Sequence, residues 1–167
     1  MVGKIDSIMK RQLNIYFIAT ISFLLAMMLT ILPLPNWANW LRPAWILMAL
    51  IYWVIKVPNS ISIEVAWILG LLQDILTGTT LGEHALILVI IAYFISKFYL
   101  KIRLLSLLQQ SLVVFTIAIT YQSLIFCTQC LTGPTLITWQ YWLSSLTSSL
   151  LWPWLFTLLQ QLYPETK

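Results

Sequence analysis

Residues 70–83, GLLQDILTGTTLGE, are the segment from which the arrangement of the whole chain can be worked out. They contain three of the five glycines and lie between segments that are otherwise apolar. On a helix, Gly70, Asp74 and Gly78 form one stripe, with Asp74 about one turn before the helix end. A carboxylate is costly in a membrane-spanning helix, and at this end it also faces the negative end of the helix dipole. The sequence therefore predicts that another group compensates the charge of Asp74.

The composition of the chain identifies its class. Of its 167 residues 60% are hydrophobic and 8% charged, whereas soluble domains carry about 25% charged residues. Too few charges are present to cover a water-facing surface, so we expect an integral membrane protein whose main surroundings are the lipid bilayer. The net charge of +4 comes from small basic clusters between apolar segments, a pattern that sets orientation in a membrane and does not indicate a nucleic-acid surface.

The apolar segments predict an all-α fold with six transmembrane helices in one bundle, a single domain covering residues 1–167. The second span is short for a perpendicular crossing, so it either thins the bilayer or is shielded by its neighbours. Six spans place both termini on one side, and every Lys and Arg except Arg42 lies on that side, which is therefore cytoplasmic. The expected spans are residues 13–32, 44–57, 61–77, 83–103, 105–131 and 139–162.

Three local patterns have simple explanations. Thr80-x-x-Glu83 has the form of a capping box that opens the fourth helix. His84, the only histidine, then lies at an outer helix start, where partner contact and simple exposure are equally plausible. The Cys127-x-x-Cys130 pair lacks the further ligands of a zinc site, so we expect two small fillers near a helix end and no metal.

The sixth span carries a predicted packing surface. Ser144/Ser148 and Ser145/Ser149 are two overlapping pairs of small residues that let helices approach closely. Pro153 follows within the same span and should kink the helix, because it removes one backbone hydrogen bond and crowds a carbonyl.

Two partners for Asp74 can be considered. Arg42 precedes the second helix and Asp74 ends the third, so a short hairpin should place them as neighbours at the outer end, where Arg42 could offer a bidentate contact. Alternatively, Asp74 accepts hydrogen bonds from Thr77, Thr79 or backbone N–H groups of the glycine turn, and Arg42 binds lipid phosphate. Both alternatives make Asp74 structural first.

Several motifs, in this order and spacing, resemble the rod shape-determining protein MreD family over residues 32–156. The matching residues are Arg42-Pro43-Ala44-Trp45, Tyr52-Trp53, Pro58, Gly70-x-x-x-Asp74-x-x-x-Gly78-x-x-Leu81-Gly82 and Leu151-Trp152-Pro153-Trp154. The chain departs from the family pattern at residues 59–64. The candidates for structural or partner-binding roles are Arg42, Pro43, Gly70, Asp74, Gly78, Leu81, Gly82, Ser148, Trp152, Pro153 and Trp154.

The resemblance implies a non-enzymatic, multi-pass scaffold of the bacterial inner membrane without a cofactor. Such a subunit of the cell-elongation complex helps to maintain rod shape by linking peptidoglycan synthesis to the cytoskeleton. Its expected partners are the bitopic protein MreC and, directly or through MreC, MreB, RodA and penicillin-binding protein 2. The resemblance also implies a fold similar to the six-helix substrate-binding subunits of energy-coupling-factor transporters.

Other classes of function make different demands on the sequence. The residues contain no Ser–His–Asp or Cys–His set and no phosphate-binding glycine loop, which argues against an enzyme. Asp74 and Glu83 could together hold a cation or move a proton. The alternative function is a membrane solute-binding subunit of a transporter, with Asp74 and Arg42 facing a pocket between helices.

Overall fold

The computed structural model describes residues 2–33, 35, 39–58, 61, 63–132 and 142–162. In this part of the chain all regular structure is helical, with six α-helices and one short 3₁₀ helix. The predicted turn at Gly133-Pro134 and the end of the chain at Lys167 lie outside the described residues. The elements are α1 (Val2–Ile31), η1 (Asn39–Leu41), α2 (Trp45–Lys56), α3 (Ile63–Thr77), α4 (Glu83–Arg103), α5 (Leu107–Thr132) and α6 (Leu143–Leu162).

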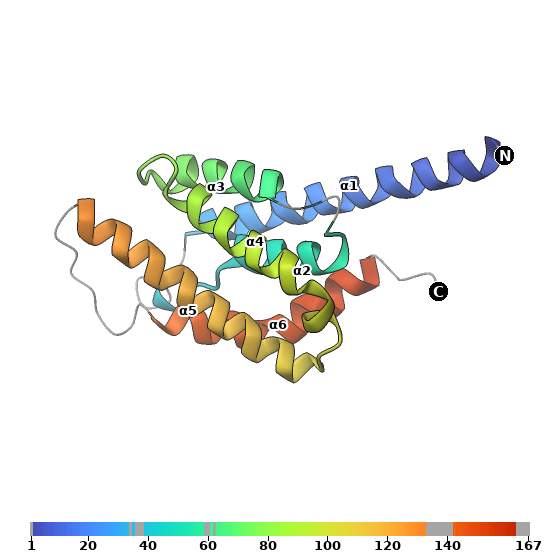
Figure 1. Ribbon diagram of the computed structural model, residues 1–167. Coiled ribbons are helices and arrows are strands. Elements are labelled where there is room, and N and C mark those ends of the chain that lie inside the picture. The colour runs from blue at the N-terminus through green and yellow to red at the C-terminus, as the bar shows by residue number, and fades with distance from the viewer. Residues whose placement is uncertain are drawn as a thin grey trace.

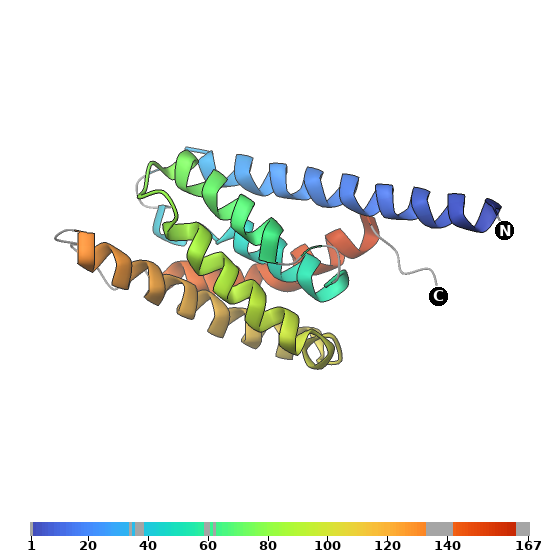
Figure 2. The ribbon, with the colours of Figure 1, turned by 45° about the horizontal axis from the view of Figure 1, so that its top comes forward.

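Successive helices run in alternating directions along the long axis of the molecule (Figure 1). Val2 and Leu162 therefore lie at the same end, and the turn between α3 and α4 lies at the opposite end together with the end of α5. The second view shows the same alternation (Figure 2). We call the end that carries Val2 and Leu162 the terminal end and the other the turn end.

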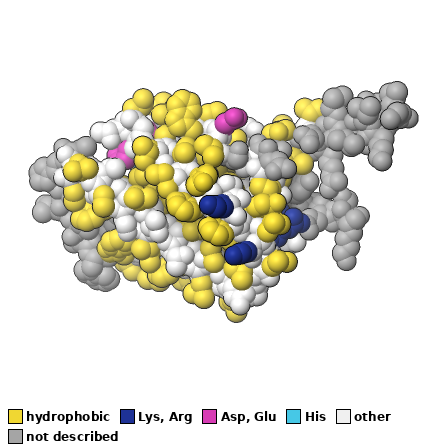
Figure 3. Space-filling view, in the orientation of Figure 1, with side chains coloured by type: hydrophobic (Ala, Val, Ile, Leu, Met, Phe, Trp, Pro, Cys, Tyr) yellow, Lys and Arg dark blue, Asp and Glu magenta, His cyan; other side chains and the backbone are white. Residues whose placement is uncertain are grey.

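Three basic side chains mark the terminal end. Lys56 is in the last turn of α2, and Lys101 and Arg103 are in the last turn of α4, so all three belong to helix ends that point to the terminal end. On the face seen in Figure 3, the Lys and Arg side chains lie among apolar ones. Asp74 and Arg42 belong to the turn end.

In the described part of the chain, three helices are long and apolar enough to cross a membrane. They are Leu13–Ile31, Glu83–Arg103 and Leu107–Leu131. Exposed large apolar side chains cover much of the surface, for example Leu104 and Leu108. A surface of this kind fits a membrane protein, since water would leave these side chains unfavourably solvated.

Helix α2 forms the centre of the bundle. It has only 12 residues, about 18 Å of helix, yet every residue from 46 to 55 is buried. It packs against α1, α4, α5 and α6. Because it is apolar on all sides, it can be covered completely without burying a charge. The indole N–H of Trp53 donates to the Ser22 hydroxyl at 2.7 Å and so ties α2 to α1.

A second indole anchors α6. Trp152 is fully buried, and its N–H points to the Gln110 amide oxygen on α5 at 3.4 Å. The Gln110 amide nitrogen in turn donates to the carbonyl of Ile102 at 3.3 Å, at the end of α4. Pro153 lies inside α6, and the helix continues through it to Leu162. Trp154, two residues beyond Trp152, is 60% exposed, so the two tryptophans have opposite environments.

Candidate functional site

The predicted glycine turn between α3 and α4 is built from two left-handed glycines. Gly78, with a φ of +67°, ends α3, and the Thr79 N–H donates to the Asp74 carbonyl at 3.2 Å. This bond after a left-handed glycine is the Schellman arrangement of helix ends. Gly82, with a φ of +99°, precedes α4 as its N-cap. Side chains other than glycine rarely adopt such angles, so both positions favour glycine.

Gly70 brings the backbones of α3 and α4 together. A Cβ atom at this position would lie 2.1 Å from the Cα atom of Ala85 and 2.5 Å from its nitrogen. These are backbone atoms and cannot rotate away. The absent side chain therefore permits a helix approach that no other residue would allow, and this approach places Asp74, one turn later, beside the start of α4.

The carboxylate of Asp74 is compensated by the first turn of α4. Its Oδ2 accepts the Gly82 N–H at 2.7 Å, and its Oδ1 accepts the His84 N–H at 2.9 Å. Nδ1 of His84, at 2.7 Å, and the Thr79 hydroxyl, at 3.2 Å, contact the same Oδ1. The carboxylate thus lies at the unfavourable end of its own helix and at the favourable, positive end of the next one. This is the compensation that the sequence required.

Two expectations for this turn were wrong. His84 is not at an exposed position, because it is 6% exposed and bonded to Asp74. Thr80 and Glu83 do not form a capping box, because Gly82 is the N-cap and no side chain of the N-cap takes part. Instead, the Thr80 hydroxyl donates to the Glu83 carboxylate at 3.0 Å, and the Thr128 hydroxyl of α5 donates to its other oxygen at 2.6 Å.

Arg42 and Asp74 do not form the ion pair considered as one of the alternatives. The guanidinium of Arg42 donates to the carbonyl of Thr30, and at 2.6 Å to the carbonyl of Leu32. These carbonyls belong to the end of α1, which is the negative end of that helix. Each of the two charges therefore compensates a different helix terminus, and neither depends on the other.

The serine face of α6 packs against the start of α2. Ser148 is fully buried, and its hydroxyl oxygen accepts the backbone N–H of Ala44 at 3.0 Å. The Ser144 hydroxyl donates to the carbonyl of Arg42 at 2.6 Å. Pro43 lies between these two contacts and is half-buried. The face thus contacts protein, and it holds the segment from which Arg42 reaches α1.

A cavity of about 300 Å³ lies among these elements at the turn end, and we call it the polar cavity because polar side chains interrupt its apolar lining. The residues that sequence reasoning missed here are Gln73 on α3 and Tyr121 on α5, whose side chains form a hydrogen bond of 2.9 Å. A buried glutamine inside an apolar span was the available signal for Gln73, one residue before Asp74. The cavity is lined by Thr30, Trp40, Arg42, Pro43, Ala44, Trp45, Ile46, Leu47, Gln73, Thr77, Thr79, His84, Tyr121, Gln122, Ile125, Gln129 and Ser144.

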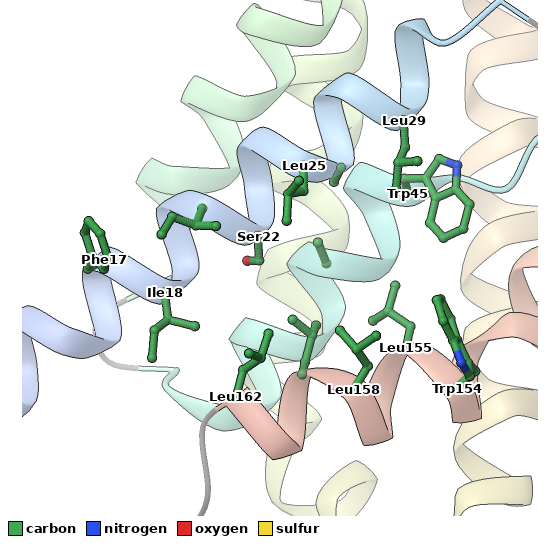
Figure 4. Close-up of a pocket in the computed structure, with 14 residues that line it drawn as sticks. Phe17, Ile18, Ser22, Leu25, Leu29, Trp45, Trp154, Leu155, Leu158 and Leu162 are labelled. Atoms are coloured by element: carbon green, nitrogen blue, oxygen red, sulfur yellow. The ribbon is translucent and has the colours of Figure 1, made fainter.

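An apolar groove of about 370 Å³ lies between α1 and α6, with α2 behind it (Figure 4). In this view Ile18 and Leu162 lie toward one end of the groove, and Trp45 and Trp154 lie at the other end. We call it the α1–α6 groove. It is lined by Phe17, Ile18, Ile21, Ser22, Leu25, Ala26, Leu29, Trp45, Ala49, Trp154, Leu155, Leu158, Leu159 and Leu162.

The remaining candidates lie apart from both places. Leu81 is 74% exposed at the tip of the glycine turn. Cys127 and Cys130 are exposed near the end of α5, so the expectation that they fill space in the protein was wrong. Within the described ranges, no three His, Cys, Asp or Glu side chains come together as metal ligands.

Comparison with known proteins identifies the family. The sequence model of the family described as rod shape-determining protein MreD matches residues 10–162. The Rod shape-determining protein MreD of Haemophilus influenzae is 39% identical over 145 residues, which is 87% of this chain and 90% of that protein. No solved structure matches significantly. The chain therefore belongs to the MreD family of shape-determining proteins, which is a structural family and not an enzyme family.

Proposed function

We propose that this protein is a six-span scaffold of the bacterial inner membrane, with both termini in the cytoplasm and a single domain over residues 1–167. A role in cell shape follows from the family. The number of spans is supported by the alternating helix directions and by the common end of Val2 and Leu162. The basic residues at the terminal end support a cytoplasmic position for that end.

The short helices are compatible with six crossings. Helix α2 covers about 18 Å and α3, with 15 residues, about 22 Å, against a hydrocarbon core of about 30 Å. Neighbouring helices enclose α2, so its ends need not meet lipid. The similarity to substrate-binding subunits of energy-coupling-factor transporters stays part of this proposal.

The partner that we propose is the single membrane helix of MreC, and the α1–α6 groove is the face that receives it. The groove follows α1 from Phe17 to Leu29, about 18 Å. Leu25 is 54% and Leu158 40% exposed, so side chains from both walls are available for contact. Ala26 on α1 and Ala49 on α2 are small residues in its floor, and small residues let membrane helices approach closely.

The observation that carries this proposal is that α1 and α6 face each other across apolar side chains (Figure 4). In a bilayer such a groove is filled by an acyl chain or by another helix. A scaffold needs a helix there. MreB, RodA and penicillin-binding protein 2 would then be reached directly or through MreC, so that wall synthesis outside the membrane is coupled to filaments inside.

Site-specific photocrosslinking in cells tests the proposal. A photoreactive amino acid at Leu25 or Leu158 should crosslink to MreC. The matched control is Ile75 on α3, which is 65% exposed but lies outside the groove. Crosslinks to MreC from Ile75 and none from Leu25 and Leu158 would place the partner on another face.

Deletion of the gene tests the wider function. Rod-shaped cells should become round, and expression of the intact chain should restore their shape. The alternative function, a solute-binding subunit of a transporter, is favoured by the polar cavity at the turn end. It would replace the scaffold if shape were unaffected while uptake of a vitamin failed.

A further inference from the structure

The polar cavity has the size and composition of a site for a small molecule. Its volume of about 300 Å³ is at the lower end of the range for ligand pockets. This volume is the space of about ten water molecules, or of a molecule with about ten non-hydrogen atoms. Trp40 and Trp45 provide apolar surface, and Gln73, Gln122 and Arg42 provide polar groups on the same cavity.

Three buried polar atoms of these side chains lack a hydrogen-bond partner among the described residues. They are the side-chain oxygens of Gln73 and Gln122 and the Nε of Arg42. Gln73 is 9% and Gln122 5% exposed, so bulk water does not surround them. Buried polar atoms of this kind are uncommon in folded proteins and call for a partner. A hydroxyl group meets the requirement well, because it can donate to an amide oxygen or accept from an amide nitrogen.

Arg42 is the one charged residue in the described lining of the cavity. Two of its nitrogens donate to the backbone carbonyls of Thr30 and Leu32 at the end of α1, and no acidic side chain among the described residues pairs with it. Asp74 follows the lining residue Gln73 in the sequence, but its carboxylate already accepts hydrogen bonds from four donors of the turn. The cavity is therefore positive, and a phosphate or carboxylate is the group that a guanidinium binds best.

We propose that the polar cavity binds a small anionic polyol, with its anionic group at Arg42 and its hydroxyl groups at Gln73 and Gln122. Trp40 and Trp45 lie along its carbon atoms. Glycerol phosphate has this chemistry. It occurs both as a soluble molecule and as the headgroup of phosphatidylglycerol. Under the topology proposed above, the ligand therefore comes from the outer aqueous side or from the outer leaflet. This site is separate from the α1–α6 groove and does not depend on partner binding there.

Two probes distinguish the sources. The purified full chain in lipid nanodiscs is titrated with glycerol phosphate, and its melting temperature is followed. In parallel, bound phosphatidylglycerol is measured by native mass spectrometry in competition with phosphatidylcholine, whose headgroup has no hydroxyl. Binding of glycerol phosphate alone assigns a soluble ligand, binding of phosphatidylglycerol alone assigns a lipid, and binding of both assigns the headgroup as the recognised part. Each of these results supports the site when the variants below agree.

The decisive variant is Gln122→Leu, which removes the amide and keeps the side-chain size. We expect at least a tenfold loss of affinity for whichever probe binds, with the unfolding temperature of the ligand-free protein unchanged or raised. Arg42→Gln should also weaken binding, but it removes contacts to α1, so Gln122→Leu carries the test. The matched control is Gln160→Leu on α6, an exposed position that should bind like the wild type. Equal binding by wild type and Gln122→Leu, or no binding of either probe, would overturn the proposal and leave a cavity that holds only water.

Discussion

The contact between α3 and α4 is closed, whereas the groove between α1 and α6 is open. At Gly70 the backbones of α3 and α4 touch, and Asp74 connects the end of one helix to the start of the other. Between α1 and α6, apolar side chains such as Leu25 and Trp154 remain exposed. The first contact leaves no space for another molecule, so its residues determine the fold. The groove contributes less to the fold and leaves surface for a partner. Five substitutions should separate these two roles.

Gly70→Val should have the largest effect. The added Cβ would meet the Ala85 Cα at 2.1 Å, and overpacking against atoms that cannot move is expected to destabilise the fold by about 3 kcal/mol or more. The measurement is the yield of monodisperse protein on size-exclusion chromatography. Because the contact is with backbone atoms, adding Ala85→Gly should not restore the yield. Recovery in that double variant would show that side chains, and not backbones, set the distance between α3 and α4.

Asp74→Asn should have the second largest effect on stability. The new amide directs an N–H donor at a backbone N–H donor of Gly82 or His84 and removes the charge at the start of α4. Hydrogen bonds to charged groups contribute about 1.5–3 kcal/mol, so we expect a loss in that range, measured by thermal unfolding in detergent. The variant also tests the independence of the two charges at the turn end.

Arg42→Gln should destabilise the protein through the end of α1, and the loss in the double variant with Asp74→Asn should equal the sum of the two single losses. The reason is that Arg42 contacts Thr30 and Leu32 and not Asp74. A double variant no worse than the worse single one would restore the ion pair as an explanation.

Gly78→Ala should destabilise the protein less than Asp74→Asn or Arg42→Gln. No atom lies within 4 Å of the Cβ position, so the change meets no steric contact, but the φ of +67° is unfavourable for alanine by about 1–2 kcal/mol. Gly78→Asn should lose less, because asparagine tolerates this conformation better. Unfolding temperatures of the two variants, compared with Gly70→Val, separate backbone strain from helix contact. Equal temperatures for Ala and Asn would argue against strain as the cause.

Leu25→Ala in the α1–α6 groove should have the smallest effect on stability. Leu25 is 54% exposed, and changes at exposed positions usually stay within about 0.5 kcal/mol. Recovery of MreC with the variant should nevertheless fall, as measured by pull-down from detergent. Ile75→Ala is the control, because Ile75 is also exposed but lies outside the groove. If both variants recover MreC equally, the groove is a lipid-facing surface.

The periodicity of the sequence placed the helices well, because long apolar segments between Gly, Pro and charged residues have few alternative structures. It also placed Gly70 and Asp74 one turn apart on α3, and Gly70 contacts the backbone of α4 at Ala85, whereas Gly78 lies beyond the last residue of α3, Thr77. The alternative in which Asp74 accepts hydrogen bonds from Thr79 and from backbone N–H groups of the glycine turn is confirmed, whereas its contact with the His84 side chain was not predicted. Gly82 and His84 come within reach because of the angle of the turn. The glycines permit the positive φ values on which this angle depends, but they do not fix the angle itself.

The wrong prediction of a capping box and the rejected alternative of an ion pair have one physical cause. Thr80-x-x-Glu83 fits a capping box locally, but Asp74 already occupies the start of α4 from the preceding helix. The pairing of Arg42 with Asp74 followed from opposite charges at the same end of the bundle. Instead, Arg42 contacts the end of α1 and Asp74 contacts the start of α4. The sequence alone does not show which helix terminus will lie beside a given charge. The alternative function included a pocket between helices faced by Arg42 and Asp74, and Arg42 does line the polar cavity. Its other polar residues were not predicted, since Gln73, Tyr121 and Gln122 meet only after α3 and α5 are packed.

The central position of α2 has a consequence for how the protein is made. The ribosome releases α2 before α4, α5 and α6, and these are three of the four helices that cover it. At about 18 Å it is too short to be a strong insertion signal by itself, so the translocon should admit it together with α3 as a hairpin. Until α6 is synthesised, part of the most buried helix of the mature protein stays uncovered. A nascent chain that ends before residue 143 should therefore be recognised as incomplete and degraded by membrane proteases.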